Sequence, residues 1–147
     1  MLKYLSSTLY NDAARLLNSE THELAQENYN VSSRIMVLIN QNFDAEEVEF
    51  KLALASLFNR PTKNGQPIDS VQTEKLITLY LEILEKDPNN PSANYNIATI
   101  YYNIGAEIIN NMDYDMDIEK LNKVQDYCVG IFLKGLPYMH KSYELKF

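Results

Sequence analysis

The chain has 147 residues, a formal net charge of -7 and a single cysteine. This length is enough for one domain with a hydrophobic core that needs no disulfide or metal, and one cysteine excludes both an internal disulfide and a metal site built from cysteines. Because the charge balance is acidic and no basic stripe is present, nucleic acid and anionic membrane surfaces are poor candidate partners.

The start of the chain and its apolar runs give no sign of a targeting or membrane segment. Residues 1–6 lack the apolar core and the small-residue cleavage site of a signal peptide. No apolar run reaches the length of a transmembrane helix. We therefore expect a cytoplasmic location by default and no membrane insertion, while the sequence leaves open that the chain is a mature or excised piece of a longer protein.

The N-terminal part of the chain has the periodicity of α-helices. Apolar residues recur every three or four positions, and no window alternates with period two, so we expect no sheet. The pattern predicts helices over about 2–17 and 19–40 and, after a polar break, a third helix over 44–58. Asp44, with Glu47 three residues later, is typical of the residue that caps a helix N-terminus.

Proline and glycine mark the next boundaries. A polar stretch over 59–69 that contains both residue types predicts a loop. Asp69 or Ser70 can cap the fourth helix, which ends just before Pro88. Pro91 suits the first turn of a fifth helix, because its missing N–H leaves no hydrogen bond unmade there.

The last third of the chain predicts two long helices, over about 91–111 and 118–145, joined by an acidic turn from which Asp115 or Asp117 can cap the last helix. An apolar stripe with small residues at two points runs along the last helix, as expected where another helix approaches closely. Pro137 lies inside this pattern and should kink the helix, because it removes a backbone hydrogen bond. The stripe consists of Leu121, Val124, Cys128, Ile131, Gly135, Tyr138, Ser142 and Leu145.

The segment 87–105 resembles a junction between two tetratricopeptide repeats. That family ends one repeat with a proline, and the next helix carries a Leu-Gly pair, a tyrosine three residues later and a closing glycine. The matching positions here are Pro88, Ile97, Ala98, Tyr101 and Gly105. Asn94 departs from the family, which usually has an aromatic residue there. The preceding helix fits too, with Leu76, Tyr80 and Ile83 in place of the family's small, aromatic and small residues.

The end of the chain matches the same repeat pattern and is similar to the last helix of many bacterial tetratricopeptide proteins. Gly135, Met139 and Ser142 stand at the matching offsets, and Phe147 stands where the terminal proline would be. The interval from Pro88 to Phe147 is much longer than the family period of about 34 residues. We interpret the excess as two lengthened helices.

The resemblance implies an all-α fold of about six helices, a right-handed α-α superhelix of stacked antiparallel helix pairs. It implies a single domain over 1–147, with helical hairpins over about 2–41, 44–87 and 91–147. Stacking is physically required, because one helix pair cannot bury its apolar face alone. The family presents a groove to protein or peptide partners and is generally non-catalytic, so we expect a protein-interaction module without a cofactor.

The polar side of the fifth predicted helix is the candidate partner-binding surface. In the family this side of the first helix of each pair lines the concave groove, and Tyr and Asn give large contact areas with adaptable hydrogen bonds. An ordinary solvated helix face is the alternative interpretation. The predicted contact residues are Ser92, Tyr95, Asn96, Thr99, Tyr102 and Asn103.

Three patterns resemble catalytic or metal sites without completing them. His22 begins a zinc-protease motif in which Gln26 replaces the second histidine. The aspartates of 113–117 resemble the start of a calcium loop, but Ile118 stands where the sharp turn needs glycine. Cys128 lies in the apolar stripe, which favours a buried hydrophobic role over a nucleophile. We expect no catalytic residue and no metal site.

Two alternative functions remain open at this stage. The apolar last helix could dock on a copy of itself, which would make the chain a structural or oligomerising unit. The acidic turn or a space between the long helices could instead hold calcium or another small ligand.

Overall fold

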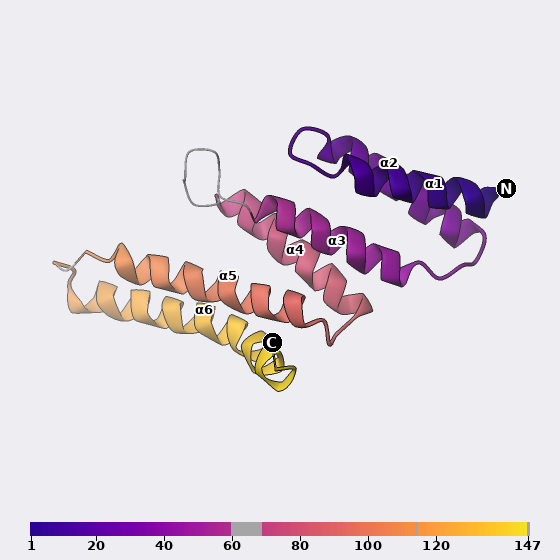
Figure 1. Cartoon of the computed structure of the whole chain (residues 1–147). Helices are drawn as coiled ribbons and strands as arrows, with labels where there is room; N and C mark the ends of the chain where they lie inside the picture. The colour runs from indigo at the N-terminus through magenta and orange to yellow at the C-terminus, as the bar shows by residue number, and fades with distance from the viewer. Residues whose placement is uncertain (60–68, 114, 147) are drawn as a thin grey trace. The chain divides into compact units, whose positions relative to one another are not determined.

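A computed structural model describes residues 1–59, 69–113 and 115–146 of the chain, and these residues form six α-helices and no strand (Figure 1). The prediction of an all-α chain with six helices is therefore confirmed for the described part. The predicted loop over 59–69 lies almost wholly outside the described residues, as do Tyr114 and Phe147. The helices are α1 (Leu2–Leu16), α2 (His22–Leu38), α3 (Asp44–Phe58), α4 (Ser70–Lys86), α5 (Pro91–Asn110) and α6 (Ile118–Glu144).

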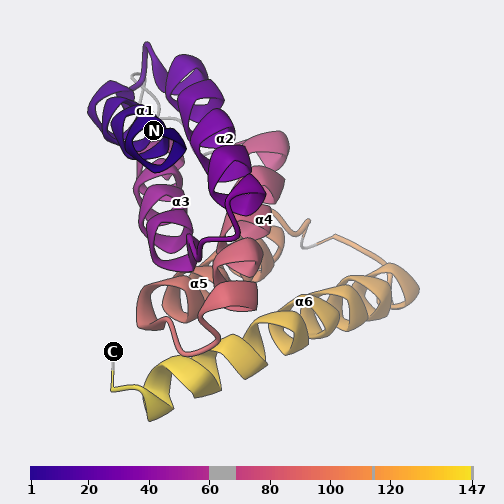
Figure 2. The same ribbon diagram turned by 90° about the vertical axis from the view of Figure 1, so that its right-hand side faces the viewer.

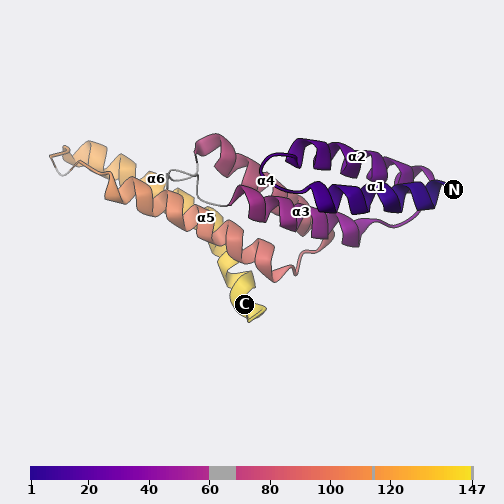
Figure 3. The same ribbon diagram turned by 45° about the horizontal axis from the view of Figure 1, so that its top comes forward.

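The helices fall into two compact units, Met1–Asp87 with α1 to α4 and Pro88–Phe147 with α5 and α6. In the first unit α1 packs along α2, and α3 packs along α4. Figures 1 and 3 show that α1 and α2 run antiparallel side by side. In the second unit α5 and α6 form one long antiparallel hairpin, which the same two figures show.

Small and aromatic side chains share the core of the first unit. Ala13 and Ala25 are fully buried where α1 and α2 pack together. Tyr29 on α2 stacks on Phe50 of α3, with ring centroids 4.3 Å apart and an interplanar angle of 2°. Phe43, just before α3, also stacks on Tyr29, with ring centroids 6.0 Å apart. The aromatic residues thus join the α1–α2 pair to α3.

The start of α3 differs from the sequence prediction. Asp44 is the first residue of the helix and not its cap; the cap position belongs to Phe43, whose side chain accepts no capping hydrogen bond. The side-chain oxygen of Asn42 accepts the hydrogen bond from the Asp44 backbone N–H at 2.9 Å. The Asp44 carboxylate instead pairs with the Lys86 ammonium at the end of α4, at 2.9 Å. A tertiary partner has therefore displaced the local capping role.

Three other helix starts follow the sequence signals. Asp69 caps α4 by accepting the Gln72 N–H at 2.7 Å. Asn90 caps α5 by accepting the Ala93 N–H at 3.0 Å, and Pro91 occupies the first turn. Of the two aspartates proposed for α6, Asp117 is the cap, and it accepts the Lys120 N–H at 2.8 Å.

The two helices of the second unit approach closely at glycine. A Cβ added to Gly135 of α6 would lie 2.9 Å from the Cβ of Tyr101 and 3.4 Å from the carbonyl oxygen of Ala98, both on α5. Gly105 lies inside α5 rather than at its end, because the helix continues to Asn110. A Cβ at Gly105 would lie 2.5 Å from the Phe132 ring, so the glycine makes room for this aromatic side chain.

Helix α6 remains one helix across Pro137. Figure 2 shows α6 along much of its length, and Figure 3 shows its yellow C-terminal end turning away from the direction of its first turns. Proline inside a helix removes one backbone hydrogen bond and crowds the preceding turn, which bends the axis. Within the described residues, none of the helices has both the length and the apolar character required to cross a bilayer.

Candidate interaction surfaces

The polar face predicted on α5 consists of two exposed tyrosines and several polar side chains. Tyr95 is 43% exposed and Tyr102 is 59% exposed. Asn96 donates from its side-chain amide to the Ser92 carbonyl oxygen at 2.8 Å, and the Thr99 hydroxyl donates to the Tyr95 carbonyl oxygen at 2.9 Å. These two polar side chains therefore already bond to their own helix. The tyrosine rings are the larger part of what a partner could contact.

The exposed face of α5 continues onto α6. Tyr102 lies against Phe132 of α6, with ring centroids 6.1 Å apart and the rings tilted by 40°. A shallow hollow of about 150 Å³ opens beside this pair. It is lined by Ala98, Tyr102, Phe132, Gly135, Leu136 and Met139. This apolar continuation was not predicted from the sequence, because it depends on the register between two helices.

A row of exposed apolar side chains on α6 adjoins the hollow. Val129, Leu136, Met139 and Tyr143 are exposed, and together with Phe132 they follow a spacing of three and four residues. On a helix this spacing places side chains on one face. This row, which we call the outer stripe of α6, lies one position beyond the buried stripe that packs against α5.

Asn94 has a structural role. It is buried, and its side-chain amide donates to the carbonyl oxygens of Pro88 and Asn90, at 3.2 and 2.9 Å. An aromatic side chain, which the repeat pattern prefers here, carries at most one N–H or O–H donor and could not donate both bonds. Asn94 thus fastens the start of α5 to the residues before it and does not belong to the exposed face.

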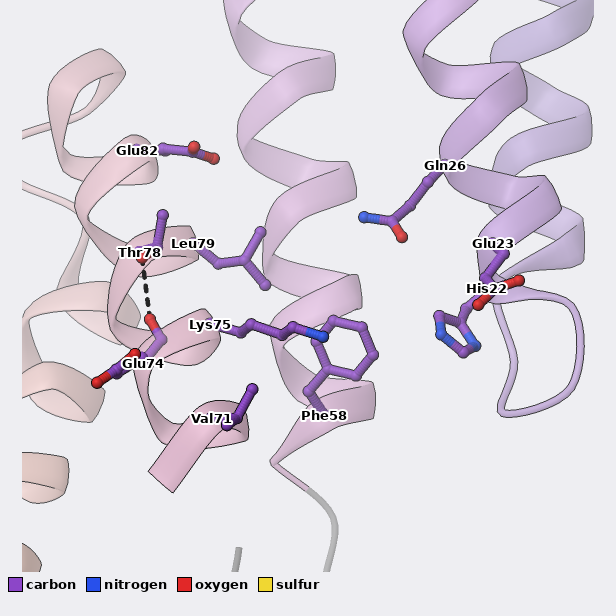
Figure 4. Close-up of a pocket in the computed structure, with 10 residues that line it drawn as sticks. All are labelled: His22, Glu23, Gln26, Phe58, Val71, Glu74, Lys75, Thr78, Leu79 and Glu82. Carbon is purple, nitrogen blue, oxygen red and sulfur yellow. Dashed lines mark hydrogen bonds between the residues drawn. The ribbon is translucent and has the colours of Figure 1, made fainter. Parts of the chain in front are cut away.

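A longer groove lies in the first unit, between α2 and α4 and over α3. Two adjoining hollows, of about 640 and 340 Å³, share Gln26, Leu79 and Glu82 in their linings. Figure 4 shows the larger one, with the Gln26 side chain from α2 and the Leu79 side chain from α4 reaching into the space between the helices. This groove, which we call the α2–α4 groove, was not predicted from the sequence.

The smaller hollow contains an ion-pair network. The Lys51 ammonium pairs with the Glu47 carboxylate one helical turn earlier and with the Glu82 carboxylate of α4 at 3.0 Å. Burial by itself would lower the pKa of Lys51, but the hydrogen bonds to both carboxylates raise it above its ordinary value. The network links α3 to α4 and leaves the lysine charge compensated.

The incomplete chemical motifs are dispersed in the structure. The His22 ring packs edge-on against Phe58, with centroids 5.4 Å apart, and lines the α2–α4 groove. Cys128 is buried, and its sulfur lies 4.0 Å from the Gly105 carbonyl oxygen. Asp117 serves as the cap of α6. Over the described ranges, no group of three or more His, Cys, Asp or Glu side chains could hold a metal ion.

The described helices pack in pairs, α1 with α2, α3 with α4 and α5 with α6, as in α-helical repeat proteins. A family model described as tetratricopeptide repeat matches residues 79–117, which run from α4 through α5 into the acidic turn. The match confirms the tetratricopeptide resemblance predicted from Pro88, Tyr101 and their neighbours. No curated protein and no solved structure matched the chain.

Proposed function

We propose that the chain is a non-catalytic protein-interaction module and that the α5 face with the adjoining hollow is its contact surface. The tetratricopeptide match supports a protein-binding role. The observation that carries the choice of surface is Tyr102, a largely exposed aromatic side chain at the edge of an apolar hollow. Interface contacts concentrate at such places, where an aromatic residue borders a small pocket.

The geometry suggests how a partner would be held. An apolar side chain of the partner would enter the hollow between Tyr102 and Met139, because this removes apolar surface from water on both sides. Tyr95 and Asn103 would contribute ring area and hydrogen bonds beside it. The absence of Lys and Arg among the six predicted contact residues disfavours a partner held by a free C-terminal carboxylate.

The test compares proteins captured from a cell lysate by the wild-type chain and by a Tyr95→Ala, Tyr102→Ala, Asn103→Ala variant. A matched control is Tyr127→Ala, which removes a tyrosine of the same unit that is 60% exposed and lies outside this face. We expect a protein that the wild type and the control retain and that the triple variant loses while still melting cooperatively. If the triple variant captures the same set as the wild type, the assignment of this face is wrong.

Self-association is a second candidate function, and the outer stripe of α6 favours it. Apolar side chains at alternating three- and four-residue spacing are typical of helices that pair with another helix. A Leu136→Glu, Met139→Glu variant would introduce four like charges into a symmetric pair. Light scattering over a concentration series should then show dimers for the wild type and monomers for the variant. A wild-type chain that stays monomeric throughout would remove this candidate.

A further inference from the structure

The α1–α2 pair carries apolar side chains on two sides. On one side Tyr10 and Tyr29 both pack against Phe43 at the start of α3, with ring centroids 5.5 and 6.0 Å apart. Figure 1 shows α3 and α4 on one side of the pair. With 3.6 residues per turn, a second set of apolar residues on each helix falls on the other side. This set, which we call the outer face, consists of Leu2, Leu5, Leu9, Leu24, Val31 and Leu38.

Most of the outer face is open to solvent. Five of its six side chains are exposed, Leu38 by 80%, and Leu9 is half-buried. The half-buried Asp12 and Asn28 are polar residues on the same side of the pair. Single exposed apolar side chains are common on protein surfaces, but a contiguous set marks an interaction site. The outer face therefore has the character of a contact surface.

The apolar row on α2 is symmetric about Val31. Leu24 precedes Val31 by seven residues, and Leu38 follows it by seven. Seven residues are close to two helical turns, so the three side chains form one row along the helix. When a second copy of α2 packs antiparallel with a two-fold axis at Val31, Leu24 meets Leu38 of the other copy and Val31 meets its own counterpart. The row is therefore complementary to itself.

The apolar residues of α1 are symmetric about the same axis. The hydroxyl oxygens of Ser6 and Ser32 lie 2.9 Å apart, so these two residues are at one level of the antiparallel pair. One residue further, Ser7 of α1 is then level with Val31 of α2. Leu5 and Leu9 each stand two residues from Ser7. The axis through Val31 thus also pairs Leu5 with Leu9 of the second copy.

Two charged side chains on α2 border the row. Glu27 and Arg34 are exposed on the side of the row away from α1, and neither has an ion-pair partner among the residues that the structure describes. The axis at Val31 places Glu27 level with position 35 of the second copy, one residue and about 1.5 Å from Arg34. Each Glu27 therefore lies beside Arg34 of the other copy, and the symmetry makes two such pairs.

The other charged residues of the two helices do not oppose this arrangement. The Asp12 carboxylate already pairs with Arg15 at 2.8 Å. The same axis brings Lys3 and Glu23 level with positions 11 and 39 of the second copy, which are uncharged. No like charges are therefore brought to one level along either helix.

From this symmetry we infer that the outer face binds the outer face of a second copy of the chain, in an antiparallel two-fold dimer with its axis at Val31. A two-fold contact requires a surface that is complementary to itself, and here the leucines, the valine and the charge pair all meet that requirement at one axis. The outer face shares no residue with the α2–α4 groove or with the α5 face. The inference is therefore independent of the proposed protein-binding function.

The first test places a charge on the axis. Sedimentation equilibrium over a concentration series should show a monomer–dimer equilibrium for the full wild-type chain. Val31→Glu should leave only monomers, because two carboxylates would face each other within an apolar contact. Val37→Glu, at a 74% exposed position of the same helix outside the face, is the matched control and should change the dissociation constant by less than about twofold.

A charge exchange tests the pairing itself. Glu27→Arg and Arg34→Glu should each raise the dissociation constant about tenfold, because two exposed ion pairs become two like-charge contacts. An equimolar mixture of these two variants should regain the wild-type affinity, since each arginine of one chain then meets a glutamate of the other. Non-specific repulsion between acidic chains would instead make the two variants shift in opposite directions.

The outer stripe of α6 is a different surface, and the same measurement separates the two. Leu136→Glu, Met139→Glu should leave a dimer held by the outer face intact, whereas it dissociates a dimer held by α6. The inference is overturned if the wild type is monomeric at every concentration, or if Val31→Glu dimerises as the wild type does. A mixture of the two charge variants that regains no affinity would also overturn it.

Discussion

Ser6 on α1 and Ser32 on α2 each donate a hydroxyl hydrogen bond to the backbone carbonyl oxygen of the other, at 3.0 and 2.9 Å. Both side chains are fully buried. The pair brings two helices close together and satisfies its own polar groups where no water can reach them. It is a crossing of small residues in the first unit, as Gly135 and Ala98 form one in the second.

We expect Ser32→Ala to lower the free energy of unfolding by about 0.5–1.5 kcal/mol, the usual net contribution of a buried hydrogen bond. Ser32→Leu should cost more, about 1–3 kcal/mol, because the larger side chain has no space at the crossing. Urea titrations followed by circular dichroism measure both. A Leu variant as stable as the Ala variant would show that α1 and α2 are not in close contact here.

Two glycines of α6 should respond in opposite directions to the same substitution. Gly135→Ala should destabilise the chain by about 1–3 kcal/mol, because the new methyl group would overlap Tyr101. Gly130→Ala meets nothing within 4 Å and should stabilise by about 0.5–1 kcal/mol through its better helix propensity. Ala98→Leu, across the crossing from Gly135, should behave like Gly135→Ala. Melting temperatures that shift in the same direction for both glycine variants would contradict this packing.

Acid should weaken the contact between the start of α3 and the end of α4. The hydrogen bond from Lys86 holds the pKa of Asp44 below its ordinary value of 3.8. A carboxylate with a depressed folded-state pKa stabilises the fold above its unfolded pKa, and this stabilisation is lost as the pH falls through the folded value. Asp44→Asn should therefore melt below the wild type at neutral pH, and the difference should shrink as the pH falls through the acid range. A difference that is constant with pH would mean that the ion pair contributes nothing.

His22 offers a site for stabilisation. Its Nδ1 atom is buried and has no hydrogen-bond partner among the described residues. His22→Phe keeps an aromatic ring against Phe58 and removes the unsatisfied nitrogen, so we expect a gain of about 1 kcal/mol in unfolding free energy. His140→Phe, at an exposed position of α6, is the matched control and should change little. A lower stability of His22→Phe would show that this nitrogen has a partner in solution.

Sequence signals that act within a few residues predicted the structure well. Asp69 stands directly before α4, and a cap needs only a backbone N–H three residues away. Pro91 fits because the first turn of a helix leaves its own N–H groups unbonded. The prediction that Asp44 caps α3 was wrong. Asp44 is the first residue of the helix, and its carboxylate pairs with Lys86, which is distant in sequence.

The same local signals could not predict the contacts between helices. Periodicity places Gln26 on one face of α2 and Leu79 on one face of α4, but it does not say that the two faces line one groove over α3. The hydrogen-bonded pair of Ser6 and Ser32 could not be predicted either, because serine on a helix is ordinarily a surface residue. The six polar residues on α5 share a face by periodicity alone, and their contact with a partner stays a prediction.

Because Cys128 is buried, the rate at which its thiol reacts reports how fast the α5–α6 hairpin opens. Every molecule carries one thiol, and that thiol lies between α5 and α6 against the Gly105 carbonyl. A thiol reagent can reach it only when the hairpin separates, so at high reagent concentration the labelling rate equals the rate of that separation. The opening rate of the second unit can thus be measured without an engineered probe, whether or not the first unit stays folded.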